Sequence, residues 1–153
     1  MKKKQAAEEP KEEKKAEEPK KKAEPRKASK KADVKEWLKA QEEIQKDNEE
    51  AASNLAEVCE SLPDEVKQEL ADKHLAIDEA WDEEIDFGLE HSKYLPYSDR
   101  KVWDSPENEK KGKELHKTAM ATEEAYYSRL KEAFAEAGWV WDDDNWGYKQ
   151  KGK

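Results

Sequence analysis

Apolar side chains recur three or four residues apart in three stretches of this chain, residues 34–62, 63–91 and 106–137. This spacing places them along one face of a helix. Charged residues make up 45% of the chain and hydrophobic residues 34%, against about 25% and 45–50% in typical globular domains. The apolar faces are therefore narrow, and helices packed side by side are the arrangement that buries such faces.

The first stretch, residues 34–62, follows a helix start signal. Asp33 is a good N-cap, and Glu36 lies three residues later, as in a capping box. The apolar positions then continue for four heptads, interrupted by Gln41 and Asn48. Two interpretations stay open: the helix packs within its own bundle, or it pairs with a second copy as a coiled coil. We therefore expect either a monomer or a homo-oligomer formed through helix 34–62.

Proline marks the start of the second and third stretches. Pro63 and Pro106 can each occupy the first turn of a helix, where the missing N–H costs no hydrogen bond. Gly138 is a natural C-cap for the third helix. Trp81 and Leu130 lie at the centres of the two apolar faces, so we expect both of them in the core.

The connection between these two helices, residues 92–104, is unusually aromatic for a loop. It contains Tyr94, Tyr97 and Trp103, and we expect it to pack against the helices. No strand pattern of useful length is visible, and short connections favour antiparallel neighbours. The predicted fold is all-α: a small antiparallel three-helix bundle over residues 33–138.

The N-terminal residues 1–32 consist almost entirely of Lys, Glu, Ala and Pro. They contain no Leu, Ile, Val or aromatic residue, so burial cannot offset the entropy lost on ordering, and we predict a disordered tail. This tail carries a net charge of +6, whereas residues 33–153 carry −15.

The basic residues nearest the helical domain can contact nucleic-acid phosphates without sequence preference. They are Lys20, Lys21, Lys22, Arg26, Lys27, Lys30 and Lys31. The alternative is a solubilising linker, because Glu residues weaken the field and no aromatic residue is interleaved to stack on bases. The run Arg26-Lys27-Ala28-Ser29 also resembles a site for basophilic kinases.

The C-terminal residues 139–153 combine tryptophan with acidic side chains. Indoles are over-represented at binding hot spots, and exposed carboxylates steer a protein toward basic partners. The alternative is that the indoles fold back and cap the open end of the bundle. The candidate partner-binding residues are Trp103, Trp139, Trp141, Asp142, Asp143, Asp144 and Trp146.

The sequence shows no arrangement typical of catalysis or metal binding. None of the three His residues has a Glu three positions before it, and no two lie four apart. Asp142 begins a run resembling a calcium loop, but Trp146 falls at position five and Lys153 at position twelve, where Glu is required. Cys59 is single and adjoins acidic residues, which make a thiol less reactive. We therefore predict no catalytic, cofactor-binding or metal-ligating residue.

These features predict a non-enzymatic interaction or assembly protein that binds a basic protein surface through an acidic, Trp-rich helical body. Two alternatives remain: a nucleic-acid-associated protein that uses the basic tail, and an acidic nucleic-acid mimic that inhibits a DNA- or RNA-binding protein. No apolar run is long enough for a membrane span, and the N-terminus lacks the pattern of a secretory signal. We expect a soluble intracellular protein, cytoplasmic or nuclear, with no membrane partner.

Overall fold

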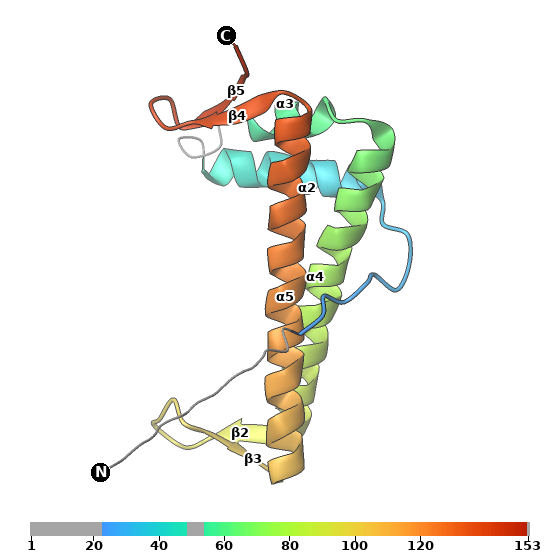
Figure 1. Ribbon diagram of the computed structural model, residues 1–153. Helices are drawn as coiled ribbons and strands as arrows, with labels where there is room; N and C mark the ends of the chain where they lie inside the picture. Colours follow the sequence, from blue (N-terminus) through green and yellow to red (C-terminus); the bar gives the residue numbers. More distant parts are fainter. Residues whose placement is uncertain (1–22, 49–53, 153) are drawn as a thin grey trace, which may run out of the picture.

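The computed structural model describes residues 23–48 and 54–152, and these residues form four helices and four short strands (Figure 1). The protein is mostly helical, as expected, but it is not a purely all-α three-helix bundle, because two antiparallel strand pairs accompany the helices. In chain order the elements are α2 (Val34–Asp47), α3 (Leu55–Glu60), α4 (Asp64–His91), β2 (Ser92–Tyr94), β3 (Lys101–Trp103), α5 (Pro106–Glu136), β4 (Trp139–Asp142) and β5 (Gly147–Gln150).

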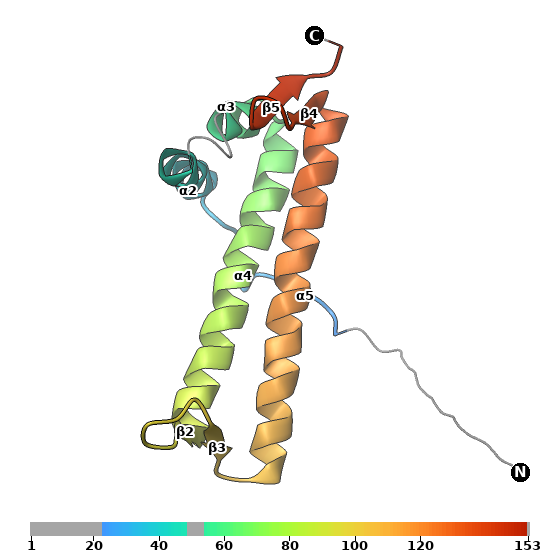
Figure 2. The ribbon, with the colours of Figure 1, turned by 90° about the vertical axis from the view of Figure 1, so that its left-hand side faces the viewer.

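Helices α4 and α5 lie side by side and form a long antiparallel hairpin (Figures 1 and 2). Their ends follow the local signals: Pro63 precedes α4, and the Ser105 hydroxyl accepts a hydrogen bond from the Asn108 N–H at the start of α5. A helix of 28 residues, the length of α4, spans about 42 Å. The buried positions include many small side chains, which allow two helices to approach closely: Ala71, Ala76, Ala80, Ala119 and Ala133.

The stretch predicted as one helix, residues 34–62, is two helices in the structure. Helix α2 ends at Asp47 with Asn48 as its C-cap, and α3 begins at Leu55 after Asn54. Asparagine suits helix ends because its side chain competes for backbone hydrogen bonds. The predicted cap at Asp33 is confirmed, since its carboxylate accepts the Lys35 N–H at 2.9 Å. A coiled coil of four heptads requires one continuous helix, whereas α2 and α3 are separate helices. Association between chains through residues 34–62 is not tested by this structure and stays a prediction.

The hydrophobic core is concentrated at one end of the α4–α5 hairpin, where α2, α3 and β4 pack against it (Figure 1). The indole N–H of Trp37 in α2 donates a 2.9 Å hydrogen bond to the buried hydroxyl of Tyr126 in α5. Leu130 is buried as expected, whereas Trp81 is only partly buried. The fully buried side chains with the largest volumes are Tyr126, Phe134, Leu70, Val58 and Cys59.

The chain before α2, residues 23–33, is extended and crosses from α5 to α4 (Figure 1). We call this segment the strap. Its backbone N–H groups donate to side chains of the helices, Arg26 to Thr122 at 2.8 Å and Ala32 to Asp72 at 2.8 Å. The predicted disordered tail covered residues 1–32, of which residues 1–22 lie outside the described residues.

The aromatic connection between α4 and α5 is a β-hairpin formed by β2 and β3, with Ser92 paired to Trp103. The Trp103 indole packs on Gly112 of α5, where a Cβ atom would lie 2.8 Å from the ring atom Cζ2. Trp103 therefore packs against the helices as expected. Tyr94 and Tyr97 differ from the expectation, because Tyr94 is 62% exposed and Tyr97 is fully exposed.

Candidate functional site: the β4–β5 hairpin

The structure divides the predicted partner-binding residues between the two ends of the molecule. Trp103 lies in β3, beside the start of α5, whereas the β4–β5 hairpin follows the other end of that helix (Figure 1). Trp139, Trp141 and the acidic turn after them lie together in this hairpin. The β4–β5 hairpin is therefore the candidate site, and Trp103 does not belong to it.

Gly138 turns the chain from α5 into β4. Its φ of 88° lies in the left-handed region that glycine adopts readily at a helix C-terminus. The next residue, Trp139, is 8% exposed and belongs to the hydrophobic core. The structure therefore gives Trp139 the capping position that the sequence offered as an alternative to docking.

Two further residues attach the hairpin to the helices. The Tyr148 ring meets the Phe134 ring of α5 edge-on, with centroids 4.8 Å apart. The Asn54 side chain, just before α3, accepts the Tyr148 backbone N–H at 2.6 Å and donates to the Tyr148 carbonyl oxygen. Sequence reasoning missed both contacts, because the partners are distant in the chain and no local pattern links them.

Trp141 and Trp146 form the exposed part of the hairpin, with side chains 38% and 57% exposed. Their rings meet at 88° with centroids 6.4 Å apart, and Trp141 also meets the Tyr148 ring at 5.0 Å. We call these three side chains the aromatic platform. Because Tyr148 is held by Asn54 and Phe134, the platform is connected to the body of the protein.

The acidic residues have different roles. Asp142 accepts hydrogen bonds from the Asp144 N–H at 3.0 Å and the Asn145 side chain at 2.7 Å, and these bonds close the turn. The hydrogen bond from Asn145 is the main reason that the pKa of Asp142 is lowered. Asp143 accepts the Trp141 indole N–H at 2.9 Å, which fixes that ring. Asp144 is exposed, and its carboxylate makes no hydrogen bond within the described residues.

Trp146 occupies an unusual backbone conformation, with a φ of 52°. This left-handed region costs roughly 1–2 kcal/mol for residues with a Cβ atom. Glycine or asparagine adopts it more easily, and the neighbours of Trp146 are Asn145 and Gly147. Since the indole is more than half exposed, packing alone does not account for tryptophan here. Strained residues of this kind cluster at functional sites.

No protein-family model, curated protein or solved structure matches the chain. Over residues 23–48 and 54–152, no three His, Cys, Asp or Glu side chains are grouped as a metal site requires. None of the helices in the same ranges combines the length and apolar character needed to cross a membrane.

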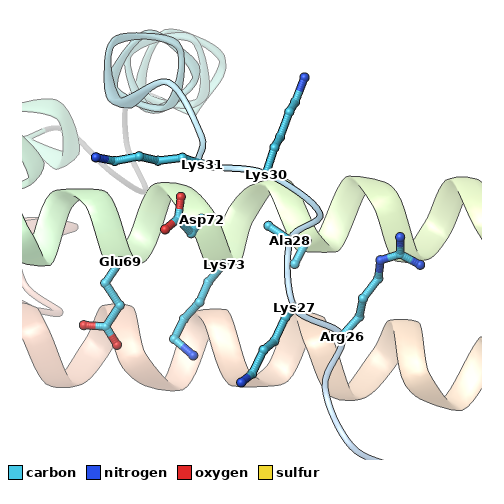
Figure 3. Close-up of a pocket in the computed structure, with 9 residues that line it drawn as sticks. Arg26, Lys27, Ala28, Lys30, Lys31, Glu69, Asp72 and Lys73 are labelled. Atoms are coloured by element: carbon cyan, nitrogen blue, oxygen red, sulfur yellow. The ribbon is translucent and has the colours of Figure 1, made fainter.

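The basic strap residues are partly engaged by the protein itself. The Arg26 guanidinium pairs with Glu83 and lies 3.7 Å from Glu79, both on α4. Lys27, Lys30 and Lys31 line a hollow of about 490 Å³ between the strap and the helices (Figure 3). The other predicted tail candidates, Lys20, Lys21 and Lys22, lie outside the described residues.

A polar cluster at the other end of the molecule closes the base of the β2–β3 hairpin. His91 Nδ1 lies 2.9 Å from Asp104 Oδ2, and the Asn108 amide donates to the other Asp104 oxygen at 2.8 Å. The Asp104 N–H also donates to the His91 carbonyl at 2.8 Å. Because these bonds join the end of α4 to the start of α5, we assign the cluster a structural role.

Proposed function

We propose that this protein is a non-enzymatic protein-binding module whose β4–β5 hairpin docks onto a basic surface of a partner. The observation that carries the proposal is Trp146, an exposed indole held in a left-handed backbone conformation beside the exposed indole of Trp141. The two rings offer a partner a large apolar contact, and tryptophan is the residue type most enriched at binding hot spots.

The site is also pre-organised, which lowers the entropy cost of binding. Asp143 holds the Trp141 indole, and Asp142 holds the turn that precedes Trp146. Asp144 stays exposed in the turn before Trp146 and adds negative charge. The partner surface that fits this arrangement is an apolar patch flanked by Lys or Arg, because complementary charge speeds encounter and sets specificity.

We propose that the protein functions in the cytoplasm or nucleus. Cys59 is the only cysteine in the chain, and its side chain is fully buried, so it is not offered for an intermolecular disulfide. The net charge of −15 on residues 33–153 favours solubility and disfavours nonspecific contact with nucleic acid through the body.

Affinity capture with matched variants tests the proposal. The full chain, Trp146→Ala and Tyr97→Ala are immobilised and exposed to lysate with and without nuclease treatment, and the retained proteins are identified and then purified. Tyr97 is the control, because it is also an exposed aromatic residue with positive φ but lies in the β2–β3 hairpin. We expect a protein that the wild type and Tyr97→Ala bind directly and that Trp146→Ala loses.

Circular dichroism must show that Trp146→Ala is folded. If the folded variant binds every purified partner with unchanged affinity, the hairpin is not the docking site. If binding to the wild type disappears once lysate is treated with nuclease, the contacts are made through nucleic acid, and the alternative based on the basic tail is favoured.

A further inference from the structure

Between its contacts with Thr122 and Asp72, the strap is held to α4 by polar contacts with the Glu79 carboxylate. The Ser29 hydroxyl and backbone N–H both donate to Glu79 of α4, at 2.5 Å and 2.8 Å. Arg26 lies against the same carboxylate and against Glu83. The bonds from Ser29 are the main cause of the lowered pKa of Glu79. The charges of Arg26 and Lys30 lower this pKa further, whereas desolvation opposes the shift. Attachment of this middle part of the strap therefore depends on Ser29 donating and Glu79 accepting.

Ser29 also lies in a conformation that a protein kinase can bind as a substrate. It is exposed, and the segment around it has no helical or strand hydrogen bonding. Basophilic kinases bind extended substrates and select arginine three residues before the serine, which is the position of Arg26. Because the hydrogen bonds of Ser29 to Glu79 are exposed, transient opening of the strap costs little free energy.

We propose that Ser29 is a phosphorylation site and that phosphorylation releases the strap from α4. The kinase transfers the γ-phosphoryl group of a nucleoside triphosphate to Oγ of Ser29. A bond forms between Oγ and the γ-phosphorus, the bond from that phosphorus to the bridging oxygen breaks, and a nucleoside diphosphate leaves. The hydroxyl proton passes to the catalytic base of the kinase.

The modified residue cannot keep the contacts of the serine. A phosphoserine carries a charge of about −1.5 to −2 and no longer donates from Oγ. The phosphate would face the Glu79 carboxylate, which is now hydrogen-bonded to Oγ. It would also attract Arg26 away from Glu79 and Glu83, because a guanidinium binds phosphate strongly. Both connections between the strap and this part of α4 are therefore lost together.

On the side of the strap that faces Glu79, carboxylates outnumber basic side chains. The hollow beside Arg26 is bordered by the carboxylates of α4 and by one lysine of α5, Lys111. Lys73 is the lysine of α4 on the other side of the strap, and its side chain points toward α5 (Figure 3). Lys30 points away from the helices (Figure 3). The carboxylates that border the hollow beside Arg26 are Glu79, Asp82, Glu83, Asp86 and Glu90.

The test uses the full chain and amide hydrogen exchange measured by NMR. The protein is phosphorylated with ATP and the catalytic subunit of cyclic-AMP-dependent protein kinase, and the modified residue is mapped by mass spectrometry. We expect phosphate on Ser29 and exchange about tenfold or more faster at the Ser29 and Ala32 N–H groups, given the charge repulsion at this distance. Exchange at Tyr126, in the core, should stay unchanged.

Three variants complete the experiment. Ser29→Ala should not be modified at this position, and Ser29→Glu should accelerate exchange of the Ala32 N–H without any kinase. In Glu79→Gln, phosphorylation should accelerate exchange less than in the wild type, because the repelling carboxylate is gone. Absence of phosphate on Ser29 overturns the modification site. Unchanged or slower exchange in both the phosphorylated protein and Ser29→Glu overturns release of the strap.

Discussion

Asn54 binds both backbone polar groups of Tyr148 with a single side chain, although the two residues are 94 positions apart. Its oxygen accepts the Tyr148 N–H, and its nitrogen donates to the Tyr148 carbonyl. The Asn54 amide therefore pairs with the β5 backbone and links this strand to the start of α3. This contact fixes the strand that carries one ring of the aromatic platform.

We expect Asn54→Ala to lower the free energy of unfolding by about 1–3 kcal/mol, because two partly buried backbone groups lose their partner. Asn48→Ala is the matched control. Asn48 is exposed, and its side chain makes only a 3.5 Å contact with the Ile44 carbonyl, so this change should stay within about 0.5 kcal/mol. Urea denaturation followed by tryptophan fluorescence measures the free energy of unfolding of both variants. Equal losses would mean that the contact between Asn54 and Tyr148 does not stabilise the protein.

Gly112→Ala should destabilise the protein although alanine favours helix more than glycine does. A Cβ atom at position 112 would overlap the Trp103 indole, and overpacking of this kind costs about 1–3 kcal/mol. Gly88→Ala, in the last turn of α4, is the control, since the nearest neighbours of a Cβ atom there would lie at 3.7 and 3.9 Å. That substitution should stabilise the protein by about 0.5–1 kcal/mol. Thermal unfolding of the two variants should therefore shift in opposite directions.

The long helices could be predicted from sequence because their signals are local. The bounds of α4 and α5 follow Pro63, Ser105 and Pro106, together with the 3–4 spacing of apolar residues. The strands could not be predicted, because three- and four-residue segments are too short to show alternation. The break between α2 and α3 was missed because Asn48 fitted a heptad position as well as a helix end.

The candidate site was also predicted only in part, because a sequence shows local patterns and not contacts between distant segments. The Trp and Asp residues of the β4–β5 hairpin are adjacent in sequence, so their grouping was visible. The contacts that join the hairpin to the helices are long-range: Trp139 enters the core, and Asn54 binds the Tyr148 backbone. Hydrogen bonds and ion pairs between distant segments leave no periodic signal in a single sequence.

Stability should fall at alkaline pH through Cys59. Burial raises the pKa of this thiol from 9.0 to about 12. Between these two values the unfolded chain loses a proton that the folded protein retains, so unfolding becomes more favourable as pH rises. The full contribution is present below pH 9, and its loss approaches about 1.4 kcal/mol per pH unit above it.

Urea denaturation at pH 8, 9, 10 and 11 measures this effect, and Cys59→Ala should show a smaller slope. At pH 8 a disulfide reagent such as dithionitrobenzoate should react with Cys59 only when the protein unfolds, because the side chain is 0% exposed. Rapid labelling of the folded protein would contradict the burial of this residue.

Two substitutions in the turn between β4 and β5 separate electrostatic steering of the partner from positioning of the Trp146 indole. Asp144 makes no hydrogen bond through its carboxylate in the described residues, so Asp144→Asn removes charge and leaves the turn in place. It should slow association with the purified partner by about twofold to tenfold at low salt, with little change in dissociation. Asp142→Asn instead weakens the hydrogen bonds that hold the turn, so it should mainly speed dissociation by misplacing Trp146.

Surface plasmon resonance at low and high salt measures both rates for each variant. The association rate of Asp144→Asn should converge on that of the wild type at high salt, because exposed charges are then screened. The faster dissociation of Asp142→Asn should persist at high salt, since it arises from the position of the Trp146 indole. If the two variants behave alike at both salt concentrations, the acidic residues act only through their summed charge, and the division of roles within this turn is wrong.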